Sequence, residues 1–222
     1  MNSKPKKICV VGLGYIGLPT AVVIAGTGIH TVGVDVNNEI VEAINSGSAH
    51  VSEPNLDNAL KKALKNGFFK AYTSPTAADV FIIAVPTPLS KEEKQPDLSF
   101  VRSATKSICP HLKAGDLIIL ESTVPVGTTE LMLSWISEER PELRIPINED
   151  TDQDIFVAFC PERVLPGRIM EEIISNDRVI GGITERCAKR AQSLYQNFVA
   201  GECVIASHSR VAELTKLSEN SF

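Results

Sequence analysis

The sequence lacks the features of several large classes of protein. No apolar run approaches the roughly 18 residues of a membrane-spanning helix, and aromatic residues make up only 5% of the 222 residues. The 22 Lys and Arg residues are outnumbered by 27 Asp and Glu residues, and the formal net charge is −5. Because no basic run could neutralise a series of phosphates, the sequence argues against a nucleic-acid partner. The lack of a long apolar run argues against a membrane-spanning protein.

Cysteine is sparse and scattered. The chain has five cysteines, an odd number, with no CxxC pair: Cys9, Cys109, Cys160, Cys187 and Cys203. A disulfide framework would need an even set, and a structural zinc site would need closely spaced pairs. We therefore predict reduced thiols, a cytoplasmic protein and no metal site.

The first 35 residues carry a dinucleotide-binding fingerprint. The apolar run ICVV at 8–11 is followed by Gly12, Gly14 and Gly17 in the pattern GxGxxG, and then by an Ala-rich apolar stretch. The first glycine permits the turn, the second lets a pyrophosphate approach the backbone, and the third lets the helix pack closely on the strand. Asp35 ends the next apolar run and is placed to accept hydrogen bonds from a ribose. With no Arg or Lys beside it, this carboxylate favours NAD over NADP.

Apolar strands alternate with helical segments along the chain, which predicts an α/β fold with a doubly wound parallel sheet of the Rossmann type. Strands are expected at 8–11, 31–34, 80–85, 117–120, 155–159, 179–180 and 203–205. Helices are expected at 18–25, 37–45, 56–64, 97–109, 128–139, 185–198 and 209–222. The acidic segment 141–154 is expected to be an irregular loop.

Polar residues follow three of the predicted strands, as PTP at 86–88, ST at 122–123 and CPER at 160–163. Ligands of open α/β sheets gather at the carboxyl ends of the strands, so these segments predict a shared cleft. Glu162 is either a surface ion-pair residue or a general base, and Thr129 is either a helix N-cap or a cofactor contact. Lys216 and Asn220 lie four apart on one face of the last helix, which is either an exposed polar face or part of the site.

Six motifs resemble the UDP-glucose/GDP-mannose dehydrogenase family, and most closely its UDP-N-acetyl-D-mannosamine-oxidising branch. They are GLGYIG at 12–17, VPTP at 85–88, ESTVPVGTT at 121–129, CPERVLPG at 160–167, DRVIGG at 177–182 and KLSENSF at 216–222. They occur in the family's order and span essentially the whole chain. The resemblance implies a two-step, NAD-dependent oxidation of the primary alcohol of a nucleotide sugar to a carboxylate. In this family a cysteine captures the intermediate aldehyde as a thiohemiacetal.

The resemblance also assigns roles by motif position. The implied cofactor contacts are Gly12, Gly14, Tyr15, Ile16, Gly17, Asp35, Thr87 and Thr129. The implied catalytic residues are Thr123 and Glu162, which would position and activate water, together with Lys216 and Asn220. Lys216 would stabilise an oxyanion, since a fixed cation beside a developing alkoxide lowers its energy, and Asn220 would help hold it. The implied substrate contacts are Arg163, Val164, Lys216 and Asn220.

Two departures from the family pattern qualify the resemblance. Members that oxidise UDP-glucose or GDP-mannose carry a second glutamate where this chain has Pro166, which favours a UDP-N-acetylhexosamine. None of the five cysteines has the glycine-rich surroundings of the family's nucleophile, and Cys160 is interpreted as a packing residue. We expect residues 1–206 to form the NAD-binding domain and 207–222 to begin an interdomain helix, with the C-terminal nucleotide-sugar domain absent.

The sequence thus predicts the NAD-binding portion of a nucleotide-sugar 6-dehydrogenase that makes a uronic acid for surface polysaccharide precursors. By itself this chain is expected to be inactive. Three alternatives stay open: a non-catalytic NAD-binding regulatory module, a 6-dehydrogenase for UDP-GlcNAc or UDP-GalNAc, and a β-hydroxyacid dehydrogenase. The last gives no reason for the CPERVLPG motif. The family's use of the terminal helix region in dimers implies a homodimer.

Overall fold

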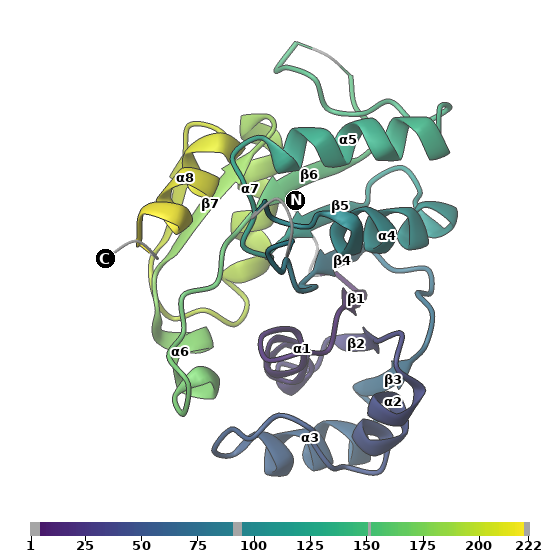
Figure 1. The fold of residues 1–222 in the computed structure, drawn as a ribbon, viewed down its shortest axis with the longest axis vertical. Helices are drawn as coiled ribbons and strands as arrows, with labels where there is room; N and C mark the ends of the chain where they lie inside the picture. Colours follow the sequence, from purple (N-terminus) through teal and green to yellow (C-terminus); the bar gives the residue numbers. More distant parts are fainter. Residues whose placement is uncertain (1–4, 91–94, 151, 220–222) are drawn as a thin grey trace.

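The protein is described by a computed structural model that covers residues 5–90, 95–150 and 152–219. Its strands form one eight-stranded sheet in the order β3-β2-β1-β4-β5-β6-β7-β8 (Figure 1). The strands are β1 (Lys7–Val11), β2 (His30–Val34), β3 (Phe69–Tyr72), β4 (Val80–Ile83), β5 (Leu117–Leu120), β6 (Phe156–Phe159), β7 (Arg178–Gly182) and β8 (Cys203–Ala206). The first six positions of this order follow the Rossmann arrangement, so the predicted fold class is confirmed.

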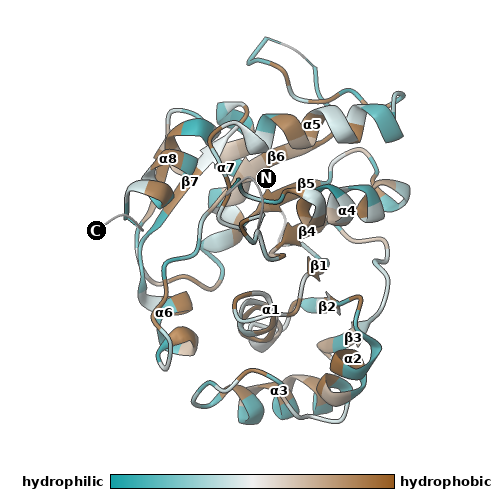
Figure 2. Ribbon diagram, viewed as in Figure 1, coloured by the Kyte–Doolittle hydropathy of each residue, from teal (hydrophilic) through white to brown (hydrophobic). Residues whose placement is uncertain are grey.

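Helices cover both faces of the sheet. They are α1 (Gly17–Gly26), α2 (Asn38–Asn45), α3 (Leu56–Lys65), α4 (Ser99–Ile108), α5 (Thr128–Glu139), α6 (Ile169–Ser175), α7 (Glu185–Tyr195) and α8 (Ser209–Glu219), with a 3-10 turn at Cys109–His111. One hydrophobic core lies between the sheet and α1, α2, α3, α6 and α7, and a second lies under α4, α5 and α8. The strands are largely hydrophobic, whereas α3 and α5 mix hydrophilic and hydrophobic residues (Figure 2).

The central strands are buried on both sides because their side chains alternate between the two cores. In β1, Ile8 and Val10 pack into the first core, while Cys9 and Val11 pack into the second. This alternation is what a parallel strand covered by helices on both faces requires. It also explains why the strand sequences read as continuous apolar runs.

The pairing of β6 with β7 is antiparallel, so the prediction of a wholly parallel sheet was wrong at this position. Because Phe159 pairs with Gly181 and Ala158 with Gly182, the start of β7 lies beyond the end of β6. The connection at 160–177 contains only the seven-residue α6, which the sequence did not predict, and the short β3 was also missed. Arg178, the first residue of β7, is thereby placed beside the residues that follow β6.

Helix α8 returns along β7 to the edge of the sheet where the strands β1 to β6 end. A Cβ atom on Gly181 would lie 2.7 Å from the Cα of Ser209, so α8 begins in close contact with the end of β7. Farther along α8, Glu213 reaches the start of α5, and Lys216 reaches Glu162. A single helix therefore contacts the segments that follow both β5 and β6.

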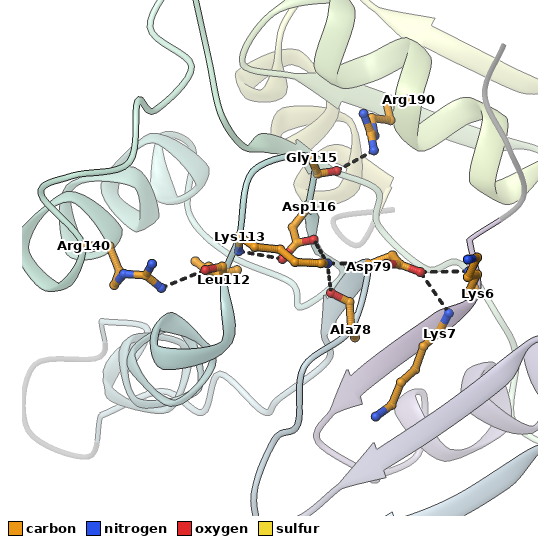
Figure 3. A network of polar contacts seen from close by, with 10 residues as sticks. All are labelled: Lys6, Lys7, Ala78, Asp79, Leu112, Lys113, Gly115, Asp116, Arg140 and Arg190. Carbon is orange, nitrogen blue, oxygen red and sulfur yellow. Dashed lines mark hydrogen bonds and ion pairs between the residues drawn. The ribbon is translucent and has the colours of Figure 1, made fainter.

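The opposite, amino edge of the sheet is closed by an ion network before β4 and β5 (Figure 3). Asp79 accepts hydrogen bonds from the backbone N–H groups of Lys6 and Lys7, at 2.8 and 3.2 Å. The Lys113 ammonium donates to the buried carboxylate of Asp116 at 2.5 Å and to Asp79 at 3.4 Å. A cavity of about 590 Å³ opens at this edge, and several of the charged residues that line it already have partners. Lys113 pairs with Asp79 and Asp116, and Arg190 donates a hydrogen bond to the carbonyl oxygen of Gly115.

Two findings limit the kinds of site in the described part of the chain. No helix there is long and apolar enough to cross a membrane. Likewise, those residues contain no group of three or more His, Cys, Asp or Glu side chains that could hold a metal ion.

Candidate functional site

The glycine-rich loop between β1 and α1 has a conformation that only glycine allows at two positions. Gly12 has φ of 93°, and a Cβ atom there would lie 2.6 Å from the carbonyl oxygen of Ala84 on the neighbouring strand. A Cβ atom on Gly17 would clash with the carbonyl oxygen of Gly12. These two glycines are therefore required by the turn and by close packing of α1 on the sheet.

Gly14 differs from its two neighbours because a Cβ atom there would meet nothing within 4 Å. Packing does not require glycine at this position, and the open space lies in the loop that begins α1. No side chain caps α1, so the positive end of its dipole faces this loop. Leu18 donates its N–H to the carbonyl oxygen of Gly14 at 3.2 Å, and Pro19 has no N–H to offer. Open space beside the positive end of a helix suits the pyrophosphate of a dinucleotide. Tyr15 is 41% exposed and Ile16 is half-buried in the same loop.

Asp35 lies directly after β2 and is half-buried. Its carboxylate accepts hydrogen bonds from the backbone N–H of Leu13 at 3.1 Å and of Asn37 at 3.0 Å. The first of these bonds ties the carboxylate to the glycine-rich loop, so the predicted ribose acceptor lies beside the predicted phosphate site.

The loops that follow β4 and β5 are joined by two hydrogen bonds. The Thr87 hydroxyl donates to the carbonyl oxygen of Thr123 at 2.5 Å, and the Ser122 hydroxyl donates to the carbonyl oxygen of Val85 at 2.7 Å. Thr87 and Thr123 are both half-buried. The structure therefore brings together two of the predicted residues, as expected for strand ends that share one edge.

Glu162 follows β6 and is only 4% exposed, so its interpretation as a surface ion-pair residue was wrong. Its carboxylate forms an ion pair with the buried guanidinium of Arg178 and accepts a hydrogen bond from the backbone N–H of Arg163 at 3.0 Å. Its backbone carbonyl oxygen accepts a hydrogen bond from the ammonium of Lys216. Glu162 and Lys216, two of the predicted catalytic residues, are therefore in contact, and Glu162 makes this contact with its backbone and not with its carboxylate.

Lys216 is half-buried, which excludes the alternative of a fully exposed polar face at this position. Burial lowers the pKa of the Lys216 amine, the nearby Glu219 carboxylate raises it, and the Arg163 guanidinium lowers it. The net direction is downward, as for an ammonium that has lost part of its hydration. Asn220, the fourth predicted catalytic residue, lies outside the described residues.

Arg163 and Val164 form the next part of the loop after Glu162. The Arg163 guanidinium forms an ion pair with Glu219 of α8 and donates to the carbonyl oxygen of Asp177 at 3.1 Å. Val164 is half-buried and packs against the first core. Arg163 is therefore the one of these two predicted substrate contacts that has a charged group near the surface. That guanidinium is already bound to Glu219 and to the carbonyl oxygen of Asp177.

Thr129 is wholly buried in the first turn of α5. Its hydroxyl and its backbone N–H donate to the carboxylate of Glu213, at 2.6 and 2.8 Å, and the N–H of Gly127 donates to the same carboxylate at 2.6 Å. The interpretation of Thr129 as an N-cap was wrong, because the N-cap of α5 is Gly127. Its role as a cofactor contact stays a prediction.

Sequence reasoning missed Arg178 and Glu213, which hold predicted site residues in place. Each is a charged residue whose partner lies on a different element, and for Glu213 that partner is 84 residues away. The only available signal was their position inside the DRVIGG run and on the terminal helix.

All five cysteines are buried free thiols. Cys160 is the nearest in sequence to Glu162, and burial raises the pKa of its thiol to about 12. Because the thiolate is the nucleophile, this residue is poorly suited to attack a carbonyl group. The burial supports its interpretation as a packing residue.

Comparison with known proteins gives one consistent result. Residues 6–199 match the profile described as the UDP-glucose/GDP-mannose dehydrogenase family, NAD binding domain. The chain is 55% identical over 215 residues to a UDP-N-acetyl-D-mannosamine dehydrogenase of Yersinia pestis, covering 97% of this chain and 51% of that protein. It is 50% identical over 217 residues to an NDP-N-acetyl-D-galactosaminuronic acid dehydrogenase of Ralstonia solanacearum, covering 98% and 51%.

The fold is shared with solved structures of the same kind. The UDP-N-acetyl-mannosamine dehydrogenase Cap5O from Staphylococcus aureus superposes with a TM-score of 0.89 at 41% identity, covering 97% of this chain and 50% of that structure. The chain therefore spans about half the length of the relatives that it matches.

Proposed function

This chain belongs to the UDP-glucose/GDP-mannose dehydrogenase family and carries its NAD-binding domain, and we propose that it is the cofactor half of a nucleotide-sugar 6-dehydrogenase. The proposed reaction oxidises UDP-N-acetyl-D-mannosamine to UDP-N-acetyl-D-mannosaminuronate in two NAD-dependent steps. The observation that carries this proposal is the contact of Lys216 with the loop that follows β6, at the same sheet edge as the glycine-rich loop.

The cofactor fits the residues present. The open space at Gly14 and the uncapped start of α1 would receive the pyrophosphate, and Asp35 would bind the ribose hydroxyls. Tyr15, Ile16 and Thr87 would complete the contacts along this edge. When bound, NAD supplies the acceptor for the hydride that leaves the sugar alcohol.

Lys216 is the residue of this chain with the clearest chemical task. The oxidised carbon carries an oxygen that gains negative charge when its proton is lost, and a fixed ammonium group stabilises that charge. The hydrogen bond to the Glu162 carbonyl uses one of the three donors of the ammonium, and the others can face the substrate. Thr123 would hold the water that the second step consumes, and Arg163 would contact the sugar nucleotide.

The second oxidation needs a thiol that can add to the aldehyde. The five cysteines of this chain are buried, so we propose that the remaining half of the natural protein supplies this thiol. In this proposal residues 1–206 bind the cofactor and α8 begins the helix that joins the two halves. Val211 and Leu214 of α8 are 45% and 55% exposed, and we propose that they pack in a homodimer.

Substrate choice is proposed from two observations. Pro166 replaces the second glutamate of members that act on UDP-glucose or GDP-mannose, and the relative from Yersinia pestis is named for UDP-N-acetyl-D-mannosamine. A second candidate is the galacto epimer, because the relative from Ralstonia solanacearum is nearly as similar. A regulatory module without catalysis would leave the contact between Lys216 and Glu162 without a purpose.

The test has two parts. Calorimetric titration of this chain should show binding of NAD and much weaker binding of NADP. The natural polypeptide that contains these residues should then form NADH from UDP-N-acetyl-D-mannosamine faster than from its gluco and galacto epimers, and Lys216→Met should abolish that turnover. NAD binding without turnover on any of the three sugars would favour the regulatory module, and absence of NAD binding would reject the proposal.

A further inference from the structure

Arg178 is the largest fully buried side chain of the described residues, and nothing in the proposed reaction uses it. Its guanidinium forms the ion pair with Glu162 and donates a hydrogen bond to the carbonyl oxygen of Ile173 at 2.8 Å. The same group lies 5.5 Å from the centre of the Tyr195 ring. A buried charge needs partners of this kind, and here they fix one orientation of the guanidinium.

The start of β7 holds two consecutive residues of the loop after β6. Arg178 binds the carboxylate of Glu162, and the carbonyl oxygen of the preceding residue, Asp177, accepts a hydrogen bond from Arg163. The antiparallel pairing of β6 and β7 makes this possible, because it places the start of β7 beside the end of β6. Asn176 adds a third contact, since its side-chain amide donates to the carbonyl oxygen of Arg163 at 2.6 Å.

Helix α8 contacts the other side of the same two residues. Lys216 donates to the backbone carbonyl oxygen of Glu162, and Glu219, one turn later, forms the ion pair with Arg163. The carboxylate of Glu162 points inward to Arg178. The backbone carbonyl oxygen of Glu162 accepts a hydrogen bond from the ammonium of Lys216. The side chain and the main chain of one residue thus connect a buried arginine to the proposed catalytic lysine.

We propose that Arg178 is a positioning residue, which fixes Glu162 so that the Glu162 carbonyl holds the ammonium of Lys216 at the edge of the sheet. The inference rests on the proposed function in one respect only, which is the chemical role of Lys216 in the reaction. A carboxylate bound to a buried guanidinium is not free to serve as a base in open solvent. Glu162 therefore contributes through the contact that it makes with Lys216.

A purely structural role for the ion pair makes a different prediction. Buried ion pairs can often be replaced by neutral residues of similar volume without loss of stability, because two charges no longer have to be desolvated. The double substitution Glu162→Gln with Arg178→Met makes that replacement and keeps an acceptor for the N–H of Arg163. If the pair serves only stability, Lys216 should not respond to it.

The experiment measures the pH dependence of acetylation of Lys216 in this chain, by mass spectrometry of the digested protein. The groups facing Lys216 are Glu162 and Arg163 on the loop and Glu219 on its own helix. In the E162Q/R178M variant we expect the titration midpoint of Lys216 to rise toward the ordinary lysine value, because the ammonium is released to water. Lys189, whose side chain is 61% exposed, reports the intrinsic reactivity of the reagent in the same samples.

The matched control is R102M/E138Q, which applies the same two changes to the exposed pair between α4 and α5 and should leave the Lys216 midpoint at its wild-type value. An unchanged midpoint in a folded E162Q/R178M protein would overturn the proposal. If that variant does not fold, the test uses Arg178→Lys, which keeps the positive charge but loses the planar guanidinium that binds the Glu162 carboxylate. The titration midpoint of Lys216 must then rise as well. The titration needs neither NAD nor sugar, so a shifted midpoint without turnover would separate this inference from the proposed function.

Discussion

The carboxylate of Glu213 on α8 accepts hydrogen bonds from both the backbone N–H and the hydroxyl of Thr129 on α5, at 2.8 and 2.6 Å. The N–H of Gly127 binds the same carboxylate, which therefore satisfies two of the free N–H groups at the start of α5. Glu213 is wholly buried. The helix that carries Lys216 is thereby attached to the helix that follows the Thr123 loop.

This attachment predicts the effect of Glu213→Gln. The substitution removes the charge and places an amide donor among three donors, so we expect the free energy of unfolding to fall by about 1.5–3 kcal/mol. Urea denaturation monitored by circular dichroism gives the value. The control is Glu130→Gln, whose exposed ion pair with Arg210 should be worth less than about 1 kcal/mol. Equal losses in the two variants would contradict the role assigned to Glu213.

The two glycines at the start of α1 should respond to alanine in opposite ways. Gly14→Ala should keep the melting temperature and weaken NAD binding, because its Cβ meets only the open space where the pyrophosphate would lie. Gly17→Ala should lower the melting temperature or prevent folding, because its Cβ clashes with the carbonyl of Gly12. Thermal unfolding and calorimetry separate the two effects. Normal NAD binding by the Gly14→Ala protein would show that the cofactor lies elsewhere.

Asp35→Ala should change the choice between cofactors. The loss of hydrogen bonds to a charged acceptor costs about 1.5–3 kcal/mol, which corresponds to a rise of about 10- to 140-fold in the Kd for NAD. Binding of NADP should change less, because the variant no longer repels the ribose phosphate. Asp57→Ala is a matched control, since it also removes a carboxylate that accepts a backbone N–H, at 2.8 Å from Ala49. An equal change for both cofactors would argue against a ribose contact at Asp35.

The parts of the fold that were predictable from the sequence are those set by local pattern. The strand at 117–120 agrees with β5, and over the described residues the other predicted strands and helices agree with the structure to within a few residues. The last three residues of the helix predicted at 209–222 lie outside the described residues. β3 was missed because its four residues alternate between buried and exposed at the edge of the sheet. The antiparallel pairing of β6 with β7 was missed because the direction of a strand depends on its contacts across the sheet. The composition of the two strands does not indicate that direction.

In the candidate site, too, residues set by local pattern were predictable and residues set by long-range contacts were not. Gly12, Gly17 and Asp35 were identified because their tasks follow from backbone geometry at fixed spacing. Arg178 was not, because an arginine at the start of a strand resembles a surface charge until its partner is known. The inward orientation of the Glu162 carboxylate depends on that same contact. Tertiary placement of charge was therefore the part that sequence pattern could not supply.

Glu121 directly follows β5 and is only 4% exposed. One of its carboxyl oxygens accepts a hydrogen bond from the hydroxyl of Tyr195 at 2.6 Å, and the other has no partner among the described residues. Burial raises the pKa of Glu121, although the Arg178 guanidinium and the Tyr195 hydroxyl oppose the shift. Burial also raises the pKa of Tyr195, so its hydroxyl stays the donor.

A raised pKa in the folded state means that the folded protein keeps its proton after the unfolded chain has lost it. The stability associated with Glu121 is therefore fully present below its ordinary pKa of 4.5 and is lost as the pH rises through the folded-state value. Glu121→Gln resembles the protonated acid at every pH. We expect the variant to gain stability relative to wild type above pH 4.5, by up to about 1.4 kcal/mol per pH unit. Urea denaturation of both proteins between pH 4 and pH 8 measures this difference, and curves that stay parallel over that range would show that Glu121 is ionised in the folded state.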